Sequence, residues 1–159
     1  MVRKRSRAAG GECMIRVLVV DDEPRVLNSL RLVLQCEGFD VETASRGAEA
    51  LERLKSGNFQ VMVSDLCMSP VDGMELLRGA RQTSPGTQVI ILTGYASPNT
   101  ARDARKNDVF DYMVKPVPAR ALAQAVRNAA IYGAAAAGGG VVDRDVMSTK
   151  SVSLRNYLR

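Results

Sequence analysis

The sequence predicts an α/β protein: a doubly wound parallel sheet with helices on both faces. Two observations support this. Short apolar runs rich in β-branched residues recur five times, and each is followed by a segment whose apolar residues are spaced as on one face of a helix. Four of the five runs also stop at a polar residue that could lie at one edge of a sheet. Alternating units of this kind favour parallel strands joined by crossover helices. We expect one domain over residues 14–132.

The expected strands are short, as is usual for strands buried on both faces. They cover residues 15–20, 39–43, 61–63, 89–92 and 110–114. The helices between them start at proline or follow glycine, residues that commonly mark helix ends. Their expected starting residues are Pro24, Ala48, Met74, Pro98 and Pro118. The first helix should stop at Gly38, the second at Gly57 and the fourth, weak in large apolar residues, at about Lys106.

The net charge of +5 lies in the two ends of the chain. Residues 1–13 hold four basic and one acidic residue, residues 133–159 hold four and two, and residues 14–132 hold fourteen of each. We therefore expect no nucleic-acid-binding face on the folded domain. Histidine is absent, which excludes mechanisms that need a histidine base or ligand. Three scattered cysteines fit a reducing compartment, and with no signal peptide or apolar membrane span we expect a cytoplasmic protein.

The two ends of the chain differ in composition from the expected domain. Residues 1–13 are predicted to be a basic, disordered extension. Residues 133–140 contain only glycine and alanine, which is typical of a flexible linker or a continuation of the last helix. Residues 141–159 form a short basic tail that is too short for a core, so the sequence indicates no output domain.

Polar residues that follow successive parallel strands meet at one edge of the sheet. Here they are Asp21 with Asp22, Asp65, Thr93 and Lys115. Three close carboxylates repel each other unless a cation joins them, and oxygen ligands suit Mg²⁺. A lysine and a threonine beside such a site suit a phosphoryl group. A carboxylate there can attack phosphorus and form an aspartyl phosphate.

A single acid after a strand is most often a helix cap or a solvated side chain. Asp72, next to Gly73, has that simpler interpretation, and so would Lys115 before Pro116 if it stood alone. The set is more specific than its members, because the acids, the threonine and the lysine follow the first, third, fourth and fifth strands in order.

These motifs resemble the receiver domain of two-component response regulators. They read Val-Leu-Val-Val-Asp-Asp-Glu-Pro over 17–24, Val-Ser-Asp-Leu-Cys-Met over 63–68, Ile-Leu-Thr-Gly over 91–94 and Asp-Tyr-Met-Val-Lys-Pro over 111–116. The resemblance covers residues 14–132 and implies a flavodoxin-like sheet with the strand order 2-1-3-4-5. It also implies a phosphoacceptor signalling domain with only self-catalysed phosphotransfer and autodephosphorylation, rather than an enzyme.

By that resemblance Asp65 is the phosphoacceptor, supplied by a histidine kinase or a phosphotransfer protein. The implied Mg²⁺ ligands are Asp22 directly, Asp21 through water, Asp65 itself and the backbone carbonyl of Cys67. Lys115 would pair with the phosphoryl group.

The resemblance also implies a switch. Thr93 would move toward the phosphoryl group and Tyr112 would turn inward, although Tyr112 can also be read as a static core aromatic. Cys67 and Tyr95 lie where the family tunes dephosphorylation. Cys67 can also be read as a redox-sensitive thiol, but a position that contributes only its carbonyl is the simpler reading.

The implied readout surface is the fourth helix, fifth strand and fifth helix, which would bind a downstream protein partner. Homodimer formation is left open.

Two departures from the family pattern concern loops. Pro70 stands one position later than is usual, and Asn107 stands in place of a glycine, where we expect a left-handed backbone.

Three functions remain to be compared. The first, which we favour, is a stand-alone receiver that switches partner binding. The second is a DNA-binding regulator acting through its basic tail, although the tail contains no helix-turn-helix pattern. The third is a hydrolase that works through an aspartyl phosphate. Such enzymes place the nucleophile on the first strand in an Asp-x-Asp arrangement, whereas this chain has adjacent Asp21 and Asp22.

Overall fold

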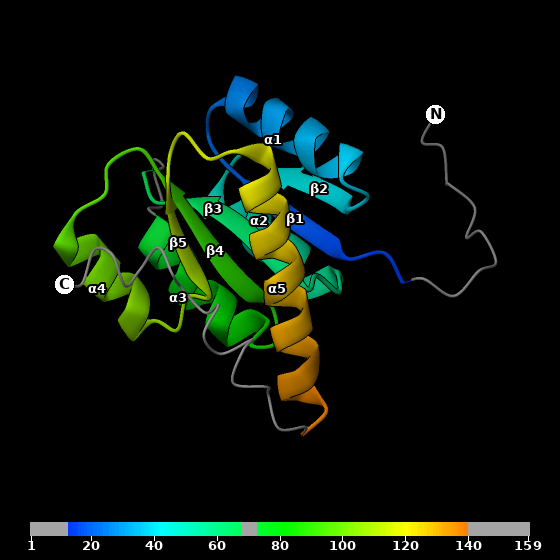
Figure 1. Ribbon diagram of the computed structural model, residues 1–159. Coiled ribbons are helices and arrows are strands. Elements are labelled where there is room, and N and C mark those ends of the chain that lie inside the picture. The colour runs from blue at the N-terminus through cyan, green and yellow to red at the C-terminus, as the bar shows by residue number, and fades with distance from the viewer. Residues whose placement is uncertain (1–12, 68–72, 140–159) are drawn as a thin grey trace.

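The computed structural model describes residues 13–67 and 73–139. Strands and helices alternate along the chain (Figure 1). The strands are Arg16–Val20 (β1), Asp40–Ala44 (β2), Val61–Asp65 (β3), Gln88–Thr93 (β4) and Asp111–Val114 (β5). The helices are Pro24–Cys36 (α1), Gly47–Ser56 (α2), Gly73–Thr83 (α3), Pro98–Lys106 (α4) and Ala119–Ala137 (α5).

The five strands form one parallel sheet in the order β2-β1-β3-β4-β5, which confirms the predicted fold class. The chain moves outward from β1 to β2, then crosses back to pair β3 with the other side of β1. This reversal leaves the carboxyl ends of β1 and β3 side by side, since Val20 pairs with Ser64. Open α/β sheets place their sites at such a reversal of strand order.

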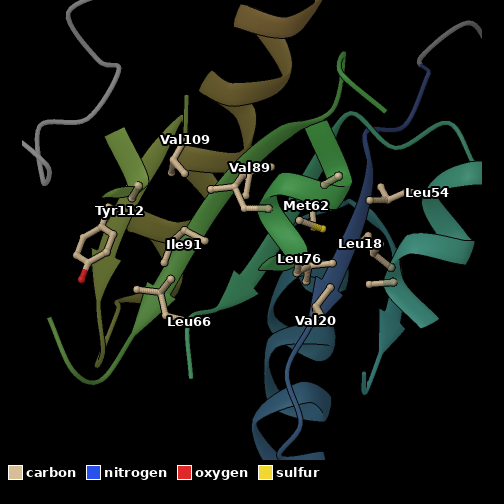
Figure 2. Packing of buried hydrophobic residues seen from close by; sticks show 14 of the residues in the cluster. Leu18, Val20, Leu54, Met62, Leu66, Leu76, Val89, Ile91, Val109 and Tyr112 are labelled. Atoms are coloured by element: carbon tan, nitrogen blue, oxygen red, sulfur yellow. The ribbon is translucent and has the colours of Figure 1, made fainter. Parts of the chain in front are cut away.

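Each face of the sheet carries its own hydrophobic core. Alternate strand residues face opposite sides, so Leu18 and Met62 join α2, α3 and α4, whereas Val17 and Val61 join α1 and α5. Figure 2 shows the first of these clusters, with Leu18, Met62 and Ile91 packed together. α5 crosses the other face (Figure 1). The three inner strands β1, β3 and β4 are almost completely buried, which explains why their sequences are largely apolar, whereas the edge strand β2 is only partly buried.

The structure differs from the sequence prediction mainly at the ends of elements. α5 continues to Ala137, so residues 133–137 are helical, which is the second of the two readings given for this segment. Asn107 has a φ of −94°, so the expected left-handed residue there is wrong. The left-handed residue is its neighbour Asp108, with a φ of 55°. Residues 1–12, Pro70, Asp72 and the tail from 140 lie outside the described residues.

Arg81 of α3 fastens the amino-terminal edge of the sheet. Its guanidinium donates to the carbonyl oxygens of Thr87, at 3.0 Å, of Asp108 and, more weakly, of Pro85. It thus ties α3 to the loops before β4 and β5. Its Nε is the one buried side-chain nitrogen or oxygen without a hydrogen-bond partner in the part of the chain that the structure describes. Burial lowers the Arg81 pKa, although the charge of Asp108 opposes this.

Among the described residues, every helix is too short or too polar to cross a lipid bilayer.

Candidate functional site

Two carboxylates and one ammonium group meet at the carboxyl edge of the sheet. Asp21 directly follows β1, Asp65 is the last residue of β3, and Lys115 directly follows β5. Lys115 Nζ lies 2.9 Å from Asp65 Oδ2 and 3.2 Å from Asp21 Oδ2. The structure therefore brings Lys115 together with two acids that precede it by 50 and 94 positions, as the sequence predicted.

Backbone N–H groups hold the other oxygen of each carboxylate. Asp21 Oδ1 accepts from the N–H of Glu23 at 2.9 Å, and Asp65 Oδ1 accepts from the N–H of Cys67 at 3.1 Å. Each acid closes a small turn over its own backbone, which short aspartate side chains do well. The turns fix the direction of both carboxylates, so their Oδ2 atoms face Lys115.

The site favours the charged form of Lys115. Burial of the ammonium alone would lower the Lys115 pKa, but the hydrogen bond to Asp65 and the negative charges of Asp21 and Asp65 outweigh burial, and the pKa is raised. Asp21 is almost completely buried, and the Lys115 side chain is 28% exposed. A positive charge is thus favoured at an edge that solvent can still reach.

Thr93 lies fully buried at the end of β4. Its hydroxyl accepts from the N–H of Tyr95 at 3.1 Å, and its carbonyl oxygen accepts from the N–H of Lys115 at 2.8 Å. The second bond joins the ends of β4 and β5 and places Thr93 beside the backbone of the lysine. Tyr95 itself is 81% exposed, so its ring is free to meet whatever approaches this edge.

Tyr112 is fully buried in this structure, with its hydroxyl 2.8 Å from the hydroxyl of Thr100. The ring therefore already points inward, and its turning on phosphorylation stays a prediction. Asp22 and Cys67 are both exposed at the same edge. The sequence reasoning missed Thr100, because a threonine inside an expected helix carries no signal of what its side chain contacts.

Magnesium suits part of the predicted ligand set. Mg²⁺ keeps several waters and is usually bound through one or two carboxylates together with phosphate oxygens. Asp21 and Asp65 form such a pair, and exposed Asp22 adjoins them. Within residues 13–67 and 73–139, however, no three His, Cys, Asp or Glu residues are grouped closely enough to hold a metal ion. The residues present therefore fit an ion held by two carboxylates and water, and a direct bond from Asp22 or from the Cys67 carbonyl stays a prediction.

A glycine that the sequence reasoning treated only as the start of a helix also shapes the site. Gly73, the first residue of α3, packs against the backbone of Asp65 and Leu66, and its N–H donates to the carbonyl oxygen of Leu66 at 2.9 Å. The end of β3 and the start of α3 are therefore in direct backbone contact. A glycine before an apolar helical run was the only available signal.

The fold and this edge define a class of protein. A family model of the response regulator receiver domain matches residues 17–127. The chain belongs to this family, the receiver domains of two-component response regulators.

Curated relatives share the same segment. The transcriptional regulatory protein GlrR of Escherichia coli (strain K12) is 42% identical over 113 residues, which make up 71% of this chain and 26% of GlrR. The transcriptional regulatory protein TrcR of Mycobacterium tuberculosis is 36% identical over 114 residues, 72% of this chain and 44% of TrcR. The chain thus matches about a quarter of GlrR and less than half of TrcR.

Solved structures agree with the fold. A CheY-like response regulator receiver domain from Methanospirillum hungatei superposes with a TM-score of 0.74 at 30% identity, covering 77% of this chain and 98% of that one. The beryllofluoride-activated NtrC4 receiver domain dimer has a TM-score of 0.70 at 33% identity, covering 74% and 98%.

Proposed function

We propose that this receiver accepts a phosphoryl group on Asp65 in a Mg²⁺-dependent reaction and that the modified form binds a protein partner differently. The donor is a histidine kinase or a phosphotransfer protein. An oxygen of the Asp65 carboxylate bonds to phosphorus while the bond from phosphorus to the donor's nitrogen breaks. The nitrogen keeps that electron pair.

The observation that supports this proposal most is the position of Lys115 between the two acids. Its ammonium contacts Asp65 at 2.9 Å and is exposed enough to meet a group attached there. Phosphoryl transfer needs positioning and neutralisation of charge more than it needs covalent help from the protein. Bound Mg²⁺ would be held directly by Asp22, Asp65 and the Cys67 carbonyl and through water by Asp21, and it would neutralise charge on the transferred oxygens.

Phosphorylation would change the balance of charge in one step. A phosphoryl group adds roughly 1.5 to 2 negative charges and three hydrogen-bond acceptors. Lys115 would then face a stronger anion, and the hydroxyl of Thr93 would gain an acceptor outside its own turn. Because these contacts exist only in the modified form, they can shift a loop equilibrium toward a second conformation.

Intact mass spectrometry tests the acceptor. The purified chain is incubated with Mg²⁺ and acetyl phosphate or phosphoramidate, which donate without a kinase. We expect the mass to increase by one phosphoryl group, with an adduct that is stable to acid and labile to base. Asp65→Asn and addition of EDTA should each abolish it.

Asp103→Asn is the matched control, because Asp103 is an exposed acid on α4, far along the chain from the acids of the site. It should be modified like the wild type. An adduct that persists in Asp65→Asn would contradict the proposal. An adduct lost in Asp21→Asn but kept in Asp65→Asn would instead favour the hydrolase alternative.

The partner would bind the face formed by α4, β5 and α5. α4 exposes Arg102, Arg105 and Lys106 against one exposed acid, Asp103, so this face favours a partner with an acidic surface. Binding by that face should weaken with added salt. The dimer named for the NtrC4 receiver gives a second possibility for this chain, and light scattering with and without acetyl phosphate measures it.

Action as a stand-alone receiver stays a prediction. The mass of the native protein in cell extracts tests whether the receiver occurs without a further domain. The basic tail, on which the DNA-binding alternative depends, lies outside the described residues. A salt-dependent gel shift that needs residues 133–159 would support that alternative.

A further inference from the structure

The inward position of Tyr112 is tied to a hydroxyl group on α4. The ring is fully buried against Ile91, Leu66 and Val109, and Figure 2 shows its hydroxyl directed out of this apolar cluster. That hydroxyl lies 2.8 Å from Thr100 Oγ1. A buried tyrosine hydroxyl needs a hydrogen-bond partner, so the rotamer of the ring depends on where Thr100 is.

Thr100 is also part of the cap that starts α4. The side chain of Ser97 accepts from the N–H of Thr100 at 3.1 Å, and Thr100 Oγ1 accepts from the N–H of Ser97 at 3.1 Å. This reciprocal pair is a capping box, with Thr100 in the place usually held by glutamate or glutamine. The hydroxyl that contacts Tyr112 therefore also determines whether the first turn of α4 is closed.

The Thr100 hydroxyl is shared between the capping box of α4 and Tyr112. A threonine hydroxyl donates once and accepts twice. Thr100 Oγ1 donates to the carbonyl oxygen of Ser97 at 3.0 Å and accepts from the N–H of Ser97. Thr100 Oγ1 also lies 3.0 Å from the Ser97 hydroxyl oxygen and 2.8 Å from the Tyr112 hydroxyl oxygen, and in both contacts either oxygen can be the donor. If the Tyr112 ring turns away, the capping box keeps its own hydrogen bonds but loses the hydrogen bond that joins it to β5.

Little else of α4 is buried deeply. Its two buried side chains are Ala101 and Ala104, which bury only a methyl group each. Burial of a single methyl group stabilises only modestly, so one hydrogen bond to a buried tyrosine is a comparable contribution. The bond between Tyr112 and Thr100 is thus a substantial share of what fixes the amino end of α4 on the sheet.

We propose that Thr100 is a positioning residue that couples the Tyr112 ring to the first turn of α4. The coupling itself is a property of the fold, and its use as a switch rests on the proposed function. Only three residues separate Thr93 from Ser97, so a movement of Thr93 reaches the same cap from the other side.

Hydrogen exchange of the full chain, measured on peptides that cover α4, tests the coupling. We expect Tyr112→Phe to accelerate exchange in α4 about fivefold, the effect of one lost hydrogen bond, and Thr100→Val to accelerate it more, because it also removes two bonds of the cap. The double variant should exchange no faster than Thr100→Val alone. Thr100→Ser, which keeps the hydroxyl, should restore the wild-type rate.

Ser97→Ala is the matched control, because it removes the other half of the capping box and leaves the Thr100 hydroxyl in place. Tyr112→Phe should still accelerate exchange on the Ser97→Ala background. The proposal is overturned if the accelerations of exchange caused by Thr100→Val and Tyr112→Phe multiply in the double variant. It is also overturned if Thr100→Ser does not exchange at the wild-type rate. Tyr112→Phe removes a single oxygen atom, so it supplies a readout even if Thr100→Val does not fold.

A second measurement separates coupling from stability alone. Mg²⁺ with beryllofluoride or acetyl phosphate should change exchange in α4 of the wild type, and Thr100→Val should lose at least half of this change while Asp65 is still modified. An unaltered response in modified Thr100→Val would overturn the switch role. If the wild type forms no adduct, the proposed function fails, and the exchange measurements without phosphoryl donor still decide the coupling.

Discussion

Gly73 lies directly against the backbone of Asp65. A Cβ at position 73 would overlap the carbonyl oxygen of Asp65 and stand 2.6 Å from Leu66 Cα, and backbone atoms have little freedom to move away. The start of α3 and the phosphoacceptor candidate are therefore packed as one unit.

Gly73→Ala should disturb both stability and the site. We expect the free energy of unfolding to fall by roughly 1–3 kcal/mol, the usual effect of overpacking, and modification by acetyl phosphate to slow because Asp65 must shift. Urea denaturation and the rate of adduct formation measure these effects. Gly86→Ala is the control, since a Cβ there meets nothing within 4 Å and should change stability by less than about 0.5 kcal/mol. Equal effects of the two variants would contradict this account.

Lys115→Met should leave two neighbouring carboxylates without their shared cation. We expect a loss of about 2 kcal/mol in unfolding free energy near neutral pH, less than the 3–5 kcal/mol of fully buried pairs, because Lys115 is partly exposed. Folding raises the Lys115 pKa, so its stabilisation is fully present below the ordinary value of 10.5 and disappears as the pH rises through the higher folded value.

Substitution of Lys115 also tests signalling. Lys115→Ala and Lys115→Met should still form an adduct on Asp65, but the adduct should no longer change partner binding, because the ammonium that distinguishes the two states is gone. Thermal denaturation at several alkaline pH values and a binding assay check the two effects. If the wild type and Lys115→Met lost stability in parallel at high pH, the ion pair would not be the cause.

Asp111→Asn should stabilise the protein in a pH-dependent way. Asp111 is buried in β5, and burial raises its pKa to about 6, against the hydrogen bond from the Tyr112 N–H that favours the charged form. The folded chain thus holds this proton more tightly, so the wild type loses stability as the pH rises from about 4 through 6.

Asparagine keeps the acceptor for the Tyr112 N–H and carries no charge. We expect Asp111→Asn to exceed the wild type by about 3 kcal/mol at pH 7.5 and to approach it near pH 4, since the pKa rises from 3.8 to about 6 and each pKa unit corresponds to about 1.4 kcal/mol. Urea denaturation across this range measures it. A difference that did not depend on pH would show that charge burial is not the reason.

Arg81→Met should loosen the edge of the sheet opposite the site. It removes the donors to the carbonyl oxygens of Thr87 and Asp108 while keeping most of the side-chain volume. We expect a loss of about 2 kcal/mol in unfolding free energy. The loss is limited because the substitution also removes the buried Nε, which has no hydrogen-bond partner and costs stability in the wild type. Arg78→Met, at an exposed position of the same helix, should be near neutral. The adduct on Asp65 should form normally in both.

The order of elements and the meeting of Asp21, Asp65 and Lys115 could be predicted from the sequence, because alternation of strands and helices determines which strand ends share an edge. The residues at which helices and strands end were harder to predict. α5 extends to Ala137 through alanines and a glycine that have no amphipathic pattern, and alanine propensity alone does not distinguish a helix from a linker.

Contacts between side chains distant in the sequence could not be predicted. The bond between Tyr112 and Thr100, and the guanidinium of Arg81 on the carbonyl of Asp108, depend on how α4 and α3 lie against the sheet. The left-handed residue was misplaced by one position, from Asp108 to Asn107, because both residues tolerate that backbone and adjacent positions compete for it. That Asp21 contacts Lys115 while Asp22 is exposed likewise depends on the exact point at which β1 ends.

The length of α5 has a consequence for how a signal could travel. Its 19 residues correspond to about 28 Å of helix, and the helix runs from the carboxyl edge of the sheet past its amino edge (Figure 1). Anything attached after residue 139 would therefore start a full domain's width from the acids. A change at Asp65 would reach the start of such an attachment through a small rotation or shift of the whole helix.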